Sequence, residues 1–223
     1  MTIAMNLDSL ISAPSALIVL GGTVAATVLR CGLGECAVTA REIAQLWGKP
    51  FAAGEARAEL ARQVQDIRRD GLLRAEHHHT GDSEFDEVTD VLFHQRSIAA
   101  LVAAHERHKA RRAAMSNTAV RLFAQAAELA PVFGMIGTLV SLNRLPQGLA
   151  NGDFSGAIGM AVLTTLYGLV AANLIFAPIA RIIERAAEAE ETARQDIVDW
   201  LAAQLYEAAP ALGPAERRKR AAA

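Results

Sequence analysis

Thr, Ser and Gly are concentrated inside the apolar stretches of this 223-residue chain. Hydroxyl groups can line a polar path or hydrogen-bond between helices without burying a charge, and small side chains let helices approach closely. An ion path across a bilayer usually needs an ionisable side chain, yet these stretches contain only Glu128, near one end. We therefore predict that the chain supplies the walls of a polar path and a second subunit the titrating group. At any single position, helix packing alone explains the same residue equally well. The residues are Gly21, Gly22, Thr23, Gly134, Gly137, Thr138, Ser141, Gly156, Gly159, Thr164, Thr165 and Gly168.

Motifs of soluble enzymes are absent from the sequence. It has no phosphate-binding Gly-rich loop, nucleophile elbow or zinc-ligand spacing, so we expect neither an enzyme nor a bound cofactor or metal. The run His77-His78-His79 lacks Cys or carboxylate partners at metal-ligand spacing and is interpreted as a polar loop. Cys31 and Cys36 make a poor metal site, and no disulfide is expected in a reducing compartment. The net charge of -2 gives no indication of nucleic-acid binding.

Three long apolar blocks divide the chain, which is 52% hydrophobic with a mean hydropathy of +0.21. Residues 9–29 and 154–180 carry no formal charge, and the residues between Arg121 and Arg144 carry only Glu128. Each block reaches the roughly 20 residues that a helix needs to cross a bilayer. Three buried helices of a soluble bundle are the alternative, but such helices normally have a polar stripe. We predict an all-α integral membrane protein with three transmembrane helices and a cytoplasmic helical domain.

Basic residues predict the orientation of these spans. Residues 30–118 contain 13 Lys and Arg and residues 181–223 contain seven, whereas the connector 144–155 contains one. The positive-inside rule places the N-terminus and the connector outside, and the middle segment and the tail in the cytoplasm. No Lys or Arg precedes Arg30, which favours a retained first span over a cleaved signal. The predicted parts are residues 1–30 with the first span, a cytoplasmic helical domain at 31–118, a two-span domain at 119–183, and a helical tail with a disordered end at 184–223.

The cytoplasmic segments have the periodicity of amphipathic helices. Thr39 and Glu42 have the spacing of a capping box, which predicts that a helix begins there. Residues 80–130 are interpreted as one long helix running into the second span, and residues 181–207 as an amphipathic helix continuing the third. A further helix is predicted from residue 54, with Gly71 ending or breaking it. Its apolar face is formed by Leu60, Val64 and Ile67.

Several stretches resemble the MotA and PomA stator subunits of the bacterial flagellar motor, within the MotA/TolQ/ExbB proton channel family. These are "APVFGMIGTLVSL" in the second span and "GAIGMAVLTTLYGLVAANLIFAPIA" in the third. The first span, "PSALIVLGGTVAATVLR", resembles the second transmembrane helix of the MotA branch, and "RRDGLLRAE" resembles its rotor-facing segment. The resemblance covers most of the chain.

The resemblance implies site residues. The two functional prolines of the family fall on Pro131 and Pro178, and its pore hydroxyls fall on Thr138, Thr164 and Thr165. Thr at these positions is common in sodium-type members and also occurs in proton-type ones, so the transported ion is H+ or Na+. Glu128 is expected at the cytoplasmic mouth of the path. The rotor-facing charges would be Arg68, Arg69 and Glu76.

The resemblance also implies partners. A MotB-like single-span subunit would carry the pore Asp, and a homo-oligomer of this chain, expected to be a pentamer, would surround a dimer of it. A FliG-like rotor protein would receive torque in the bacterial inner membrane, and the basic residues 216–220 can contact anionic lipid.

Two further readings stay open. Stators of the MotA branch have four spans and this chain begins at the second, so it is either a shortened member or a sequence that starts downstream of the true start. Its three spans and external N-terminus match a TolQ or ExbB-like energiser of envelope transport, which needs no rotor contact. A non-conducting membrane scaffold explains the missing carboxylate equally well.

Overall fold

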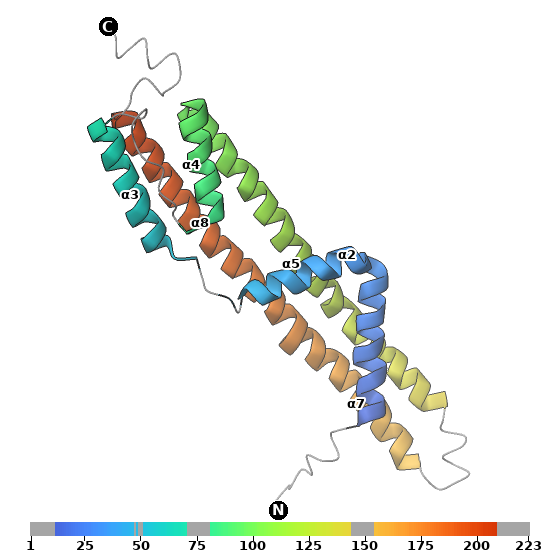
Figure 1. The fold of residues 1–223 in the computed structure, drawn as a ribbon. Coiled ribbons are helices and arrows are strands. Elements are labelled where there is room, and N and C mark those ends of the chain that lie inside the picture. Colours follow the sequence, from blue (N-terminus) through green and yellow to red (C-terminus); the bar gives the residue numbers. More distant parts are fainter. Residues whose placement is uncertain (1–11, 47, 49–50, 71–80, 144–153, 209–223) are drawn as a thin grey trace, which may run out of the picture. The chain divides into compact units, whose positions relative to one another are not determined.

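The structure is a computed structural model that describes residues 12–46, 48, 51–70, 81–143 and 154–208 (Figure 1). Every regular element among these residues is a helix, which confirms the predicted all-α class. The elements are α1 (Ala13–Ala16), η2 (Leu17–Gly21), α2 (Gly22–Leu46), α3 (Ala53–Asp70), α4 (Ser83–Gln95), α5 (Ile98–Asn143), α7 (Phe154–Val170), η3 (Ala171–Phe176) and α8 (Ala177–Ala208).

The chain forms two compact units, each assembled from segments far apart in the sequence. The first, here called the apolar unit, comprises Met1–Trp47 and Met115–Arg185. The second, here called the charged unit, comprises Gly48–Ala114 and Ala186–Ala223. Helices α5 and α8 contribute to both units because each is far longer than a membrane span requires.

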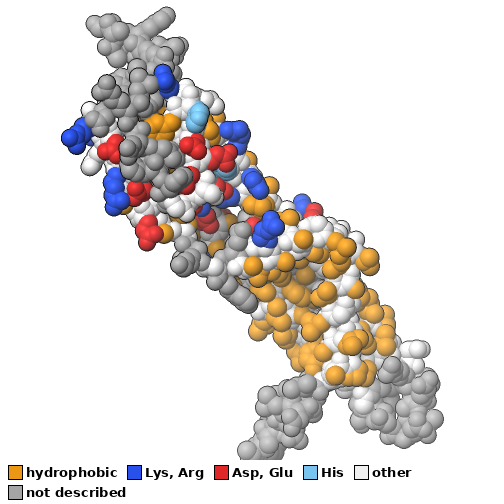
Figure 2. Space-filling model, viewed as in Figure 1, with side chains coloured by type: hydrophobic (Ala, Val, Ile, Leu, Met, Phe, Trp, Pro, Cys, Tyr) orange, Lys and Arg blue, Asp and Glu red, His pale blue; other side chains and the backbone are white. Residues whose placement is uncertain are grey.

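The apolar unit contains the membrane-spanning parts of the chain. Among the described residues, three helical stretches are long and apolar enough to cross a bilayer: Ala13–Ala44, Ile98–Asn143 and Ile158–Glu207. Large apolar side chains cover this unit, and Figure 2 shows them gathered over α2, α5 and α7. The side chains of Leu29 and Leu174 are 86% and 70% exposed. Exposing such apolar side chains to water is unfavourable, and contact with lipid removes this cost. The three predicted spans are therefore confirmed.

The first span and the helix after it form one element with a kink. Gly32 interrupts α2 with a φ of 81°, a conformation that glycine adopts without steric cost. The prediction that a capping box at Thr39 starts a new helix is wrong. Thr39 lies inside α2, and its hydroxyl donates to the carbonyl of Glu35 at 2.9 Å. Because the helix resumes directly after Gly32, the backbone N–H groups that follow Thr39 already have helical partners.

The core of the charged unit is formed by α3, α4, the first turns of α5 and the end of α8. Leu60, Val64 and Ile67 are buried on one face of α3, as predicted. The prediction of one continuous helix over residues 80–130 is wrong, because α4 ends at Gln95 and α5 begins at Ile98. Arg96 between them has a φ of 50° in the left-handed region, and its N–H closes α4 on the carbonyl of Leu92.

Candidate functional site

Glycines bring α5 and α7 into backbone contact inside the apolar unit. A Cβ atom added to Gly168 would lie 2.6 Å from the carbonyl oxygen of Ala130 and 3.1 Å from the Cα of Gly134. A Cβ on Gly137 would lie 2.6 Å from the Cβ of Thr164. Real Cβ atoms essentially never show contacts as short as 2.6 Å, so the two helices require glycine at these two positions to pack as they do.

Two of the three predicted pore hydroxyls, those of Thr164 and Thr165, lie at this helix contact, and Thr138 is next to it in sequence. Thr164 is fully buried against Gly137, and its hydroxyl donates to the carbonyl of Ala161 at 2.9 Å. Thr165 is half-buried and donates to the same carbonyl at 3.3 Å. Thr138 directly follows Gly137 and donates to the carbonyl of Met135 at 2.6 Å. Each hydroxyl thus has a backbone acceptor, and its lone pairs remain able to accept a hydrogen bond or contact a cation.

The two predicted prolines lie in α5 and α8. Pro131 lies inside α5, where its missing N–H leaves the carbonyl of Ala127 without its helical donor. Pro131 is two turns before Thr138, so both residues are on one face of α5. Pro178 is in the first turn of α8, directly after the π-helix η3. Wide π turns frequently mark functional sites. They leave exposed carbonyl groups that would be hydrogen-bonded in an α-helix.

Two polar side chains lie farther along the same helices. Glu128 is exposed on α5, three residues before Pro131. Asn173 is exposed within η3, and its amide Nδ2 donates to the carbonyl of Leu169 at 2.9 Å. Asn173 is not among the predicted site residues, although "LVAANLIFAP" contains the one amide side chain of the third span.

The charged residues predicted at the end of α3 lie in the charged unit. Arg68 and Arg69 are both exposed in the last turn of α3. The Arg68 guanidinium hydrogen-bonds Gln204 at 2.9 Å and pairs with Glu207 at 3.1 Å, both on α8. Glu76, the third predicted residue, lies outside the described residues.

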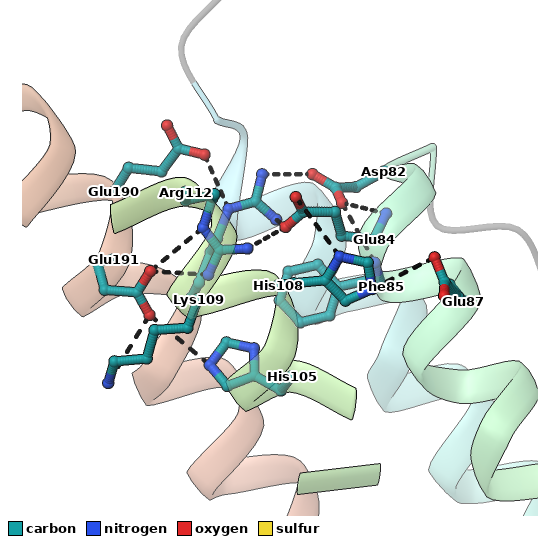
Figure 3. Close-up of polar contacts among 11 residues, drawn as sticks. Asp82, Glu84, Phe85, Glu87, His105, His108, Lys109, Arg112, Glu190 and Glu191 are labelled. Atoms are coloured by element: carbon teal, nitrogen blue, oxygen red, sulfur yellow. Dashed lines mark hydrogen bonds and ion pairs between the residues drawn. The ribbon is translucent and has the colours of Figure 1, made fainter. Parts of the chain in front are cut away.

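A network of charges, which the sequence did not suggest, joins α4, α5 and α8 of the charged unit (Figure 3). Arg112 bridges two carboxylates, those of Glu84 and Glu191, the latter at 2.7 Å. Arg194 pairs with Asp82 at 2.7 Å and with Glu190 at 2.8 Å. Such pairs fix which helix faces meet, because a mismatched register would leave a charge unpaired away from water.

Arg194 is the most buried member of this network. It is only 7% exposed, and its guanidinium lies 4.1 Å from the centre of the Phe51 ring and 5.6 Å from that of Phe85. Burial opposes the charge, but the carboxylates of Asp82 and Glu190 outweigh it and raise the pKa of Arg194. Asp82 also caps α4 by accepting from the N–H groups of Glu84 and Phe85. Burial raises the pKa of Asp82, yet the guanidinium and these N–H donors lower it overall.

His105 is buried beside this network. It is 3% exposed, and its Nε2 lies 3.8 Å from Oε1 of Glu191, too far for a hydrogen bond. Neither of these two atoms has a hydrogen-bond partner among the described residues. Burial lowers the pKa of His105, with Arg112 adding to this effect and Glu191 opposing it.

The pH dependence of stability follows from His105. Its folded pKa is below the unfolded value of 6.5, so its contribution to stability is complete above pH 6.5 and is lost as the pH falls below that value. We expect the thermal midpoint of the detergent-purified chain to fall between about pH 7 and about pH 5. His105→Gln should flatten this dependence, whereas the same change at exposed His94 should leave it intact. Equal slopes for both variants would contradict the assignment.

Comparison with known proteins identifies the family. The model of the MotA/TolQ/ExbB proton channel family matches residues 72–196, more than half of the chain. The chain belongs to this family. The predicted resemblance is thereby confirmed, and membership of a channel family agrees with the expectation that the chain is not an enzyme.

Relatives of this channel-family chain include motility proteins. Motility protein A of Aquifex aeolicus is 28% identical over 83% of this chain and 75% of its own length. Chemotaxis protein PomA of Vibrio alginolyticus is 29% identical over 91% of this chain and 81% of its own length. The Bacillus subtilis protein YtxD is 37% identical over 63% of this chain, which spans only 46% of YtxD.

Two solved stator structures have the same fold. The MotAB structure of C. jejuni matches with a TM-score of 0.79 at 18% identity, covering 90% of this chain and 82% of its own. The flagellar MotAB stator complex of Bacillus subtilis matches with the same TM-score and identity, covering 99% and 92%. The chain is therefore an integral membrane protein with the helical fold of these stator subunits.

Proposed function

We propose that this chain is the ion-conducting stator subunit of a bacterial flagellar motor. The observation that carries the proposal is the α5–α7 pair, in which glycines hold two membrane helices in backbone contact with Thr164 between them. The pair has hydroxyls and proline-freed carbonyls along it but no carboxylate of its own at this level. A wall of this composition fits a path whose titrating group comes from another subunit. Relatives that align along most of their length are motility proteins.

The mechanism couples ion transfer to rotation of this subunit. Copies of the chain, as a pentamer, surround a dimer of a MotB-like single-span subunit whose Asp takes up and releases H+ or Na+. Thr138 and Pro131 share the face of α5 turned toward that helix, and Thr165 provides the matching hydroxyl on α7. Each ion crossing the membrane delivers about 2.3 kcal/mol per elementary charge per 100 mV of potential. Neutralising the Asp lets the ring step to its next position.

The charged unit transmits this motion in the cytoplasm of the cell. In the orientation predicted by the positive-inside rule, the N-terminus is periplasmic. The tail, α3 and α4 are then cytoplasmic. Arg68 and Arg69 contact a FliG-like rotor protein, together with Glu76. The Glu207 carboxylate holds the Arg68 side chain in place at the end of α3. An exposed pair of this kind contributes little to stability and leaves the guanidinium available for a partner.

The proposed function predicts a specific motility defect. Cells that lack the gene should keep their flagella and stop swimming, and the wild-type chain should restore swimming. Arg68→Glu should reduce the swimming-ring diameter severalfold because the rotor would meet the opposite charge. Swimming is scored in soft agar and flagella are counted by microscopy.

A matched control lies on the same helix. Arg62 of α3 is exposed and pairs with Glu59 at 2.6 Å, so Arg62→Glu should leave swimming intact. Dependence of swimming speed on Na+ or on an uncoupler identifies the ion. If cells without the gene swim normally but have defects in envelope integrity or uptake, the chain has a TolQ or ExbB-like role instead.

A further inference from the structure

Asn173 is an exposed amide in the middle of an apolar helix. One of its two Nδ2 hydrogens bonds the Leu169 carbonyl, while the second and the Oδ1 acceptor have no partner among the described residues. Its neighbour Leu174 is 70% exposed, as expected for contact with lipid or with another helix. Unsatisfied polar groups are costly in hydrocarbon, and Asn is a typical residue of hydrogen bonds between membrane helices. A partner helix at Asn173 removes this cost.

Two contacts between the antiparallel helices fix the depth of Asn173. Toward one end, Gly168 meets Ala130 across the α5–α7 pair. Toward the other, the ring of Phe176 lies 6.5 Å from that of Phe123, measured between centroids. Asn173 lies between Gly168 and Phe176, and counting along α5 from the same two contacts places it level with residues 125 and 126. Glu128 is therefore two to three residues along α5 from the level of Asn173, about 3 to 4.5 Å in depth, which the two side chains can span.

Glu128 is exposed near that depth and faces away from the contact between the two helices. Ala126 and Ala130, two residues to either side of it, are both buried. Two residues along an α-helix correspond to about 200°, so Glu128 lies on the opposite side of α5 from these alanines. The carboxylate has no hydrogen bond or ion pair among the described residues, including with Asn173 of the same chain. One copy thus presents an amide on its η3 flank and a carboxylate on its α5 flank.

We propose that Asn173 of one copy donates a hydrogen bond to Glu128 of the next copy in the ring. Rotation about an axis normal to the membrane keeps every residue at its depth, so only residues whose side chains span their small difference in depth can meet across a heterologous interface. The η3 flank of each copy then meets the α5 flank of its neighbour. The second Nδ2 hydrogen of Asn173 is a donor and a carboxylate is an acceptor, which makes the two flanks complementary.

The pairing has a consequence for the ion path. This inference rests on the ring assembly that the proposed function requires, and it adds the residues that join adjacent copies. One Glu128 carboxylate per copy surrounds the mouth of the path, each oriented by the amide of its neighbour. The carboxylates attract cations to the mouth. The hydrogen bond from the amide keeps the carboxylates from approaching the path itself.

The contact between copies can be tested by cross-linking in membrane vesicles. Cys31 and Cys36 are free thiols and are first replaced by Ser. Two differently tagged full-length chains are co-expressed, one with Asn173→Cys and the other with Glu128→Cys, and treated with a short thiol-to-thiol reagent. We expect mixed-tag dimers, and a chain with both substitutions should give a ladder up to the full ring. Leu174→Cys in place of Asn173→Cys is the matched control and should give severalfold less product.

A charge exchange provides a second readout that does not depend on reagent geometry. Asn173→Asp sets two carboxylates together and should lower the fraction of assembled ring in detergent about threefold to tenfold. Adding Glu128→Gln restores a carboxylate and amide pair and should recover assembly. Equal cross-linking from Leu174, linkage of Asn173→Cys to itself or to another protein, or no recovery in the double variant would overturn the pairing. Swimming is not scored, so a failure of the stator assignment remains separate from a failure of this contact.

Discussion

Gly168→Ala should push α5 and α7 apart and weaken both assembly and ion-driven function. The added Cβ would lie 2.6 Å from the Ala130 carbonyl oxygen and 3.2 Å from the Cα of Pro131, both backbone atoms. A flexible side chain could rotate away, but backbone can move only if the whole helix shifts. Overpacking of this kind costs about 1–3 kcal/mol, more than the roughly 1 kcal/mol that Ala gains over Gly in a helix. The clash therefore determines the sign of the effect.

A glycine on the same helix serves as the control. Gly159 lies on α7, and a Cβ added there meets nothing within 4 Å among the described atoms. Gly159→Ala should assemble as well as the wild type or slightly better. Assembly is measured as the thermal midpoint and particle mass of the detergent-purified complex, and function as swimming of complemented cells. Equal behaviour of the two variants would mean that the α5–α7 contact is not as close as described.

The membrane spans were predictable because their signals are local. A run of about 20 apolar residues forms a helix in a bilayer whatever surrounds it, since each backbone group must be satisfied within its own segment. Residues 154–180 therefore predicted a span without any knowledge of its neighbours. The apolar face of α3 was equally local, because Leu60, Val64 and Ile67 repeat with the period of a helix.

The break between α4 and α5 was not predictable from local pattern. Arg96 is a good helix former, and the apolar periodicity continues across it from Leu92 to Leu101. Its left-handed conformation lets both helices bury side chains in one core, a gain that depends on α3 and α8, which are distant in sequence. Propensity is a weak prior, and tertiary packing overrides it here.

Buried polar residues were missed for a related reason. Arg194 lies in a stretch rich in Glu and Arg, which has the pattern of a solvated helix face. Only the fold brings Phe51 and Asp82 to its two sides, and a charge with such partners can be buried. The predicted pore residues Pro131, Thr164 and Thr165 do lie together, whereas their role stays a prediction.

Arg194→Met should destabilise the charged unit by about 3–5 kcal/mol, the usual cost of removing one partner from a buried ion pair. Met fills much of the same volume, so the loss reflects charge more than packing. The change removes the guanidinium that pairs with Asp82 and lies over the rings of Phe51 and Phe85. A lower thermal midpoint and faster proteolysis of the purified chain should report the loss. Arg62→Met, at an exposed pair of α3, should cost about 1 kcal/mol or less.

The partner substitution distinguishes the loss of the ion pair from a packing defect. Asp82→Asn keeps the shape of the side chain and can still accept the N–H bonds that cap α4, but it removes the negative charge that pairs with Arg194. If the carboxylate is the cause, the double variant Arg194→Met with Asp82→Asn should recover part of the stability lost in Arg194→Met. The two losses then fall short of additivity by about 1 kcal/mol or more. If the stability losses of the two single variants add strictly, the cost comes from packing against Phe51. The register of α8 against α4 would then not depend on this ion pair.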